Sequence, residues 1–80
     1  MNLERGNNIL KFDYSNLRGL MVTKYGSVAN FCREQGFGGK NMYAKLNDGK
    51  GMRTDRALEI ATALGISEPD FYKYFFTIKV

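Results

Sequence analysis

The sequence predicts a mostly α-helical fold, in which a compact bundle of four to five short helices carries short β-strands at its ends. Apolar residues recur at intervals of three and four, and glycine or a capping residue ends or begins most of these runs. Eighty residues, 44% of them hydrophobic, suffice for one modest core. We therefore expect a single domain over 1–80, with an N-terminal arm or strand (1–12), a helical core (13–75) and a C-terminal strand (75–80).

The first helix is expected from about Tyr14 to Lys24. Its apolar positions fall at i, i+3 and i+4: Leu17, Leu20 and Met21. Asp13 or Ser15 can cap its start, and Gly26 can adopt the left-handed turn that ends it. These local signals bound the first element on both sides.

The next two helices lie on either side of a glycine-rich stretch. The second opens with Ser27 as its N-cap, and it stops at Gly36. Its buried positions are Val28, Phe31 and Cys32. The third is expected from about Lys40 to Asn47, with Met42 and Leu46 four residues apart on its inner face.

The last two helices follow the turn "NDGKG". The fourth begins after Thr54 and ends at Gly65, with four apolar positions at helical spacing: Ala57, Ile60, Ala61 and Leu64. A short fifth helix opens at Ser67, where "SEPD" has the pattern of a capping box with proline in the first turn. It presents Phe71, with Tyr74 or Phe75 one turn further on.

Both ends of the chain have the composition of strands. "NILKF" (Asn8–Phe12) and "FFTIKV" (Phe75–Val80) are short and rich in β-branched or aromatic residues, and the second alternates in its apolar positions. The two strands can pair with each other, or the C-terminal strand can pair with its copy in a second chain. The second arrangement would make a homodimer.

Three glycines between Gly36 and Gly39 need an explanation. A phosphate-binding loop would need glycine where Glu34 stands and Ser or Thr where Asn41 stands, and a dinucleotide-binding fingerprint would need glycine at position 41 as well. A tight turn between two steeply crossing helices fits better, with Gly36 at positive φ and Phe37 entering the core. That geometry is a helix-turn-helix.

Charge is distributed unevenly along the chain, whose formal net charge is +4. Residues 39–56 contain five basic residues (Lys40, Lys45, Lys50, Arg53, Arg56) and two acidic ones (Asp48, Asp55). Residues 57–72 contain three acidic residues (Glu59, Glu68, Asp70) and no basic one. A domain with a positive and a negative end would be oriented by the field of nucleic acid.

The residue types argue against an enzyme. The chain has no histidine, its carboxylates form no obvious pair, and Cys32 lies on an apolar stripe. A single cysteine without further ligands also predicts no metal site and fits a reducing compartment. We expect a soluble cytoplasmic protein that needs no cofactor, membrane or small-molecule ligand.

The segment "FCREQGFGGKNMYAKLN" resembles the helix-turn-helix of the phage repressor and Cro-type superfamily, the lambda repressor-like DNA-binding domains. "RALEIATALGIS" resembles the family's fourth helix, and "KFDYSNLRGLMVTKYG" with "AKLNDGK" is similar to short phage-encoded relatives. The resemblance spans about Lys11 to Phe76. Two positions depart from the pattern, since Cys32 replaces the usual alanine and Gly39 stands where relatives often carry a base-reading amide.

The resemblance implies that the third helix lies in the DNA major groove. Base contacts would come from its exposed side chains: Lys40, Asn41 and Ala44, with Tyr43 at the margin. Phosphate contacts would come from Ser27, Lys45, Asn47, Lys50 and Arg53. Each good base contact should discriminate by roughly 1–3 kcal/mol. The open alternatives are solvated surface charge for the lysines and arginine, a ligand-free helix-start residue for Asn41, and surface packing for Tyr43.

The predicted function is that of a sequence-specific double-stranded DNA-binding transcriptional regulator of phage Cro or repressor type. It would act by occupying an operator in the bacterial host cell, as a homodimer joined through the C-terminal strand or through the helix containing "FYKYFF". The alternative is an antitoxin or antirepressor-like module whose main partner is another protein.

Overall fold

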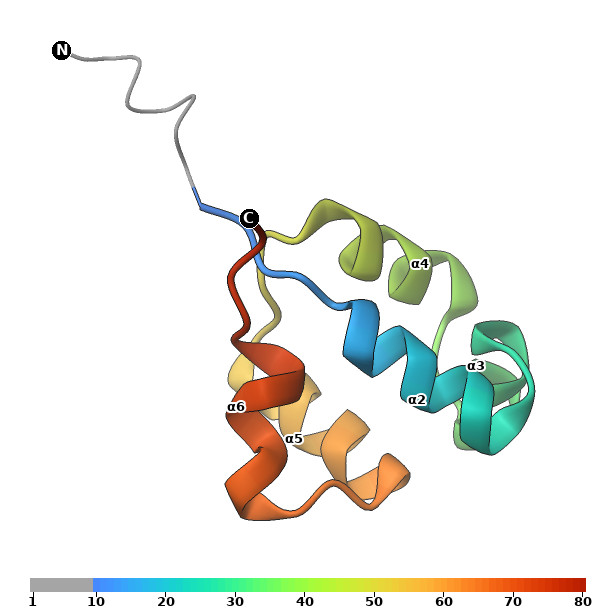
Figure 1. The fold of residues 1–80 in the computed structure, drawn as a ribbon. Helices are drawn as coiled ribbons and strands as arrows, with labels where there is room; N and C mark the ends of the chain where they lie inside the picture. The colour runs from blue at the N-terminus through green and yellow to red at the C-terminus, as the bar shows by residue number, and fades with distance from the viewer. Residues whose placement is uncertain (1–9) are drawn as a thin grey trace, which may run out of the picture.

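The structure of the chain is a computed structural model that describes residues 10–80. Five α-helices make up this part of the chain (Figure 1): α2 (Ser15–Tyr25), α3 (Val28–Gln35), α4 (Gly39–Asp48), α5 (Thr54–Leu64) and α6 (Glu68–Phe75). Every predicted helix is present, with bounds close to those expected from spacing and end signals. The described residues thus form a compact all-helical unit.

The prediction of terminal β-strands is wrong, because within residues 10–80 the two ends of the chain form no strand. The two end segments lie antiparallel to each other but form only one isolated bridge, between Phe12 and Ile78. Its flanking hydrogen bonds run from Asp13 N–H to the Thr77 carbonyl and from Lys79 N–H to the Lys11 carbonyl, each at 2.7 Å. Asn8 and Ile9, the first two residues of the predicted N-terminal strand, lie outside the described residues.

The predicted C-terminal strand (75–80) overlaps the end of α6, which lies at Phe75, where the predicted helical core (13–75) also ends. Phe75 belongs to this helix and is buried, one turn after Phe71, with the two rings stacked at a centroid distance of 4.8 Å. Phe76 still donates its N–H to the Tyr72 carbonyl at 2.8 Å. Phe75 and Phe76 are thus held by α6, so the extended segment begins only at Thr77, and within residues 10–80 it forms no more than the single bridge at Ile78.

The core gathers side chains from every helix. Six large side chains are fully buried: Leu17, Met21, Phe31, Ile60, Leu64 and Phe75. Helix α2 packs against α3, α5 and α6, which places it at the centre of the bundle. Cys32 is buried in this core, as expected, and burial raises the pKa of its thiol.

The bend between α3 and α4 has the predicted backbone. Gly36 ends α3 in the left-handed conformation, with φ of +80°. Phe37 follows at once and donates its N–H to the Cys32 carbonyl at 2.9 Å. Its ring is stacked on Phe31 at a centroid distance of 5.4 Å, so the bend is attached to the core.

The end of α4 is attached to the segment before α2. Gly49 caps α4 with φ of +68°, and its carbonyl accepts the Phe12 N–H at 2.7 Å. A Cβ atom at Gly49 would lie 2.7 Å from the Phe12 carbonyl oxygen, which is closer than real Cβ contacts come. Only glycine fits this approach.

As for membrane insertion, none of the five helices within residues 10–80 has the length and apolar character of a bilayer-spanning segment.

Candidate functional site

Helix α4 presents the side chains that the sequence assigned to DNA bases. Its inner positions, Met42 and Leu46, are buried in the core. Its outer positions are all exposed: Lys40, Asn41, Tyr43 and Ala44. The helix begins without a side-chain cap, so the backbone N–H groups of its first turn are open to an anion. Base contact by these four residues stays a prediction.

Three of the predicted phosphate-contacting residues are exposed close to this helix: Lys45, Lys50 and Arg53. Lys45 follows Asn41 by one turn of α4. Arg53 pairs with Asp55 at 3.2 Å, and both side chains are largely exposed. A surface pair of this kind contributes only about 0–1 kcal/mol, so Arg53 can exchange its carboxylate partner for a phosphate at little cost.

The other two predicted phosphate-contacting residues have partners within the chain. Ser27 caps α3, and its hydroxyl oxygen accepts the Asn30 N–H at 3.0 Å. The side-chain oxygen of Asn47 accepts a hydrogen bond from the Arg18 guanidinium at 2.6 Å. Arg18 was missed by the sequence analysis because it lies 29 residues from Asn47, beyond the reach of any local pattern.

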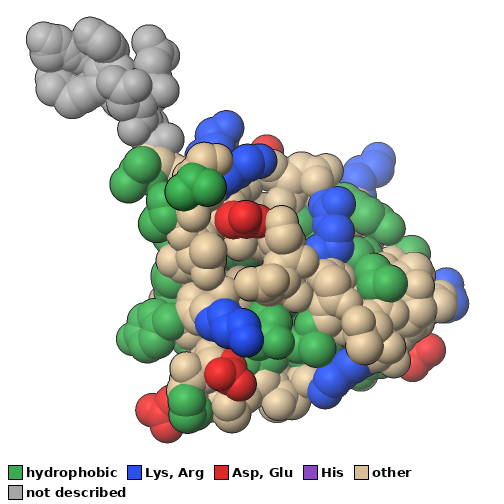
Figure 2. All heavy atoms as spheres, viewed as in Figure 1, with side chains coloured by type: hydrophobic (Ala, Val, Ile, Leu, Met, Phe, Trp, Pro, Cys, Tyr) green, Lys and Arg blue, Asp and Glu red, His purple; other side chains and the backbone are tan. Residues whose placement is uncertain are grey.

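A small groove beside α4 brings three of the predicted residues together, with a volume of about 210 Å³. Its apolar floor is formed by Phe37, Met42, Met52 and Ile60, and its polar rim by Asn41, Lys45, Arg53 and Arg56. Arg56 was not predicted as a site residue, and its guanidinium lies 5.0 Å from the centroid of the Phe37 ring. The rim is cationic, so this side of the molecule suits an anionic partner. In Figure 2, Lys and Arg side chains stand out over and beside α4.

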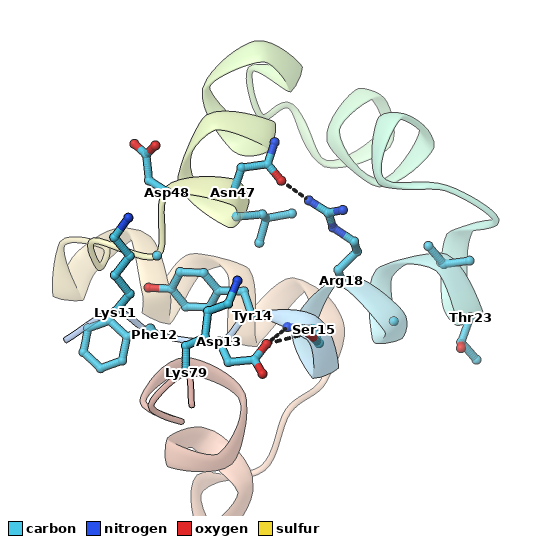
Figure 3. A pocket seen from close by; sticks show the side chains of 14 residues that line it. Lys11, Phe12, Asp13, Tyr14, Ser15, Arg18, Thr23, Asn47, Asp48 and Lys79 are labelled. Atoms are coloured by element: carbon cyan, nitrogen blue, oxygen red, sulfur yellow. Dashed lines mark hydrogen bonds between the residues drawn. The ribbon is translucent and has the colours of Figure 1, made fainter.

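A larger groove, of about 660 Å³, lies between α2, the end of α4 and the two terminal segments (Figure 3). Its charged lining carries both signs: Lys11, Arg18 and Lys79 on one hand, Asp13 and Asp48 on the other. Hydrogen bonds from the Ser15 hydroxyl and backbone N–H hold the pKa of Asp13 below its usual value, so this carboxylate stays ionised. Because its charges largely balance, the larger groove selects anions less well than the α4 face does.

Within residues 10–80, no group of three or more His, Cys, Asp or Glu residues is placed to hold a metal ion. The groups that the structure does bring together at α4 are amines, guanidinium groups, an amide and apolar side chains. Their chemistry is that of contact with phosphate, carboxylate or base edges.

Residues 10–78 match the model of the family described as "Protein of unknown function (DUF739)". Among solved structures, the chain is similar to the modulator of repression (MOR) of the temperate bacteriophage TP901-1 from Lactococcus lactis, determined in solution. The two are 33% identical, the match covers 82% of this chain and 89% of that one, and the TM-score is 0.69. No curated protein sequence matches the chain. The comparisons do not single out the Cro or lambda repressor type that the sequence analysis named.

Proposed function

This chain belongs to the DUF739 family, and on that premise we propose that it modulates repression in a temperate phage by binding the phage repressor. The observation that carries the proposal is its likeness to MOR over most of both chains. Sequence identity of a third over that share supports a common role as well as a common fold. This reading corresponds to the antirepressor-like alternative of the sequence analysis.

Protein contact is a sufficient mechanism for modulation. A protein that binds one state of the repressor shifts the repressor toward that state by mass action, by about 2.7 kcal/mol when it is present at 100 times its dissociation constant. Such a shift changes the ratio of the two repressor states about a hundredfold, and operator occupancy changes with it without any DNA contact by the modulator. The amount of modulator expressed would then determine how much of the repressor is able to occupy its operator.

The test is a two-component reporter in bacteria. One plasmid carries the repressor encoded in the same genetic element as this chain, together with its operator driving a reporter gene. Induction of the chain from a second plasmid should change repression by at least several-fold. The same operator without the repressor is the control and should not respond. If the chain silences that control by itself, repressor contact is the wrong mechanism.

Operator binding is the second candidate function, and the exposure of the α4 side chains favours it. Lys40 and Asn41 lie in the first turn of α4, and Asn41 lines the cationic groove. A major-groove helix with these residues would read guanine and adenine edges. Gel-shift titrations with the DNA flanking the gene, at several salt concentrations, test this candidate. Binding no tighter than to unrelated DNA would exclude it.

A further inference from the structure

Helices α5 and α6 form a second surface, which is apolar and acidic, whereas the surface at α4 is cationic. A groove of about 410 Å³ runs between them, with Ala61, Ile66 and Phe71 among its lining residues. Leu58 on α5 and Tyr72 on α6 also line it, although 53% and 71% of their surfaces remain exposed. We call this surface the α5–α6 face and define it by Leu58, Glu68, Phe71, Tyr72 and Phe76.

Aromatic packing extends the α5–α6 face beyond the groove. The Tyr72 ring lies 5.3 Å from the Phe76 ring, which is 43% exposed, and Phe71 lies within 6.0 Å of both. In Figure 2, hydrophobic, acidic and basic side chains lie close together over α6. Contiguous exposed apolar side chains with a polar border are typical of protein interaction sites. Exposed tyrosine is also among the residue types that most often anchor such interfaces.

The charge around the groove is negative. Glu68 lines it directly, and Asp70 accepts a hydrogen bond at 3.2 Å from the hydroxyl of Ser67, which also lines the groove. Among the described residues, no lysine or arginine lines this groove. The nearby Arg56 extends instead over Phe37 and pairs with Glu59 at 3.5 Å. The α5–α6 face therefore combines an apolar centre with acidic neighbours.

We infer that the α5–α6 face is the docking surface for a basic protein surface carrying an exposed apolar side chain, and, resting on the proposed function, that the repressor supplies it. A repressor fits this chemistry because a DNA-binding domain presents lysine and arginine to phosphate. The acidic neighbours would speed and orient the encounter, while Leu58 and Tyr72 would be buried at the centre of the contact.

A second copy of this chain is a poorer occupant. A symmetric dimer through the α5–α6 face would bring the same surface of each copy together. Each protomer would then bring a Glu68 carboxylate into the interface, and within the described residues this groove offers no lysine or arginine to pair with it. Charge complementarity thus favours a basic partner of different sequence over self-association.

The test measures binding of the purified full-length chain to the purified repressor of the same genetic element by isothermal titration calorimetry. Tyr72→Ala and Leu58→Ala should each weaken binding by about tenfold or more, as expected for buried interface anchors. Both side chains are exposed in the free protein, so the fold should survive, and circular dichroism checks this. Val22→Ala is the matched control, because Val22 is an exposed apolar residue on α2 (45%).

Charge reversal provides an independent measurement. Glu68→Lys should weaken binding at low salt, and its effect should shrink as salt is raised because salt screens the lost attraction. Glu34→Lys is the control, since it makes the same change of net charge at an exposed position of α3. The control should bind like the wild type at every salt concentration.

The outcomes separate this inference from the proposed function. If the wild-type chain binds the repressor and the Leu58, Glu68 and Tyr72 variants bind equally well, the α5–α6 face is not the docking surface, although the proposed function stands. If Lys40→Ala is the only variant that loses binding, the repressor contacts α4 and the inference is wrong. If the free chain is dimeric in sedimentation analysis and Tyr72→Ala makes it monomeric, the occupant is a second copy and the inference is wrong. Absence of wild-type binding would overturn both proposals.

Discussion

Replacing Gly49 by alanine should destabilise the protein more than the same replacement at Gly36. Both glycines end a helix in the left-handed region, with φ of +68° and +80°. The difference lies in their surroundings. A Cβ at Gly36 would meet nothing within 4 Å, whereas one at Gly49 would meet the Phe12 carbonyl oxygen at 2.7 Å and the Lys11 side chain at 3.1 Å.

The expected loss in the free energy of unfolding has two contributions. A non-glycine residue in the left-handed conformation costs roughly 1–2 kcal/mol, and this term applies to both variants. At Gly49 the Phe12 backbone must also move away, which weakens the 2.7 Å hydrogen bond from Phe12 N–H to the Gly49 carbonyl. A bond of this kind contributes about 0.5–1.5 kcal/mol. We therefore expect Gly49→Ala to lose about 1 kcal/mol more than Gly36→Ala.

Thermal unfolding followed by circular dichroism measures the difference. For a domain of this size, 1 kcal/mol shifts the Tm by about 4–8 °C, so Gly49→Ala should melt that much below Gly36→Ala. The Gly36 variant is the control for the conformational term alone. Equal melting temperatures would show that the contact between the end of α4 and Phe12 has no energetic effect, and the reasoning would be refuted.

Three further predictions concern the core and the α4 face. Phe31→Ala should lower the free energy of unfolding by about 3–5 kcal/mol because its ring is fully buried, and a loss below 1 kcal/mol in urea titrations would contradict this. The Cys32 thiol should react with Ellman's reagent only after denaturant is added, since burial covers it and raises its pKa; rapid labelling of the native protein would be inconsistent. If the chain binds DNA, Asn41→Ala should change base preference, whereas Lys50→Ala should weaken binding to every sequence and reduce the salt slope by about one unit. Gel shifts on an operator and its single-base variants distinguish the two, and equal weakening by Asn41→Ala on all sequences would show that this amide reads no base.

The helices could be predicted from the sequence because their signals are local. Ser27 and Gly36 bound α3, Gly65 ends α5, which begins at Thr54, one residue earlier than predicted, and the apolar residues of both helices recur at the helical period. The exposure of Lys40 and Asn41 follows from the same period, since Met42 and Leu46 occupy the inner face of α4. Each inference depends only on residues within about one helical turn of each other.

The prediction of the terminal strands was wrong because it also used only local signals. Alternation over "FFTIKV" is typical of a strand, but Phe75, where the predicted helix and strand meet, packs its ring into the core, and the cavity that receives it is lined by residues distant in the sequence. That cavity is a property of the packed bundle. The same limitation applies to the hydrogen bond between Arg18 and Asn47, whose partners come from α2 and α4.

By itself, the sequence determined the order of the helices within residues 10–80, the left-handed turn at Gly36 and the outward face of α4. Only the tertiary structure decided that the two ends meet at a single bridge, and that Leu58 and Tyr72 line one groove with Glu68 beside them. The physical reason is the range of the interactions. Helix periodicity and caps act over three to four residues, whereas a groove between helices depends on crossing and packing that bring distant residues together.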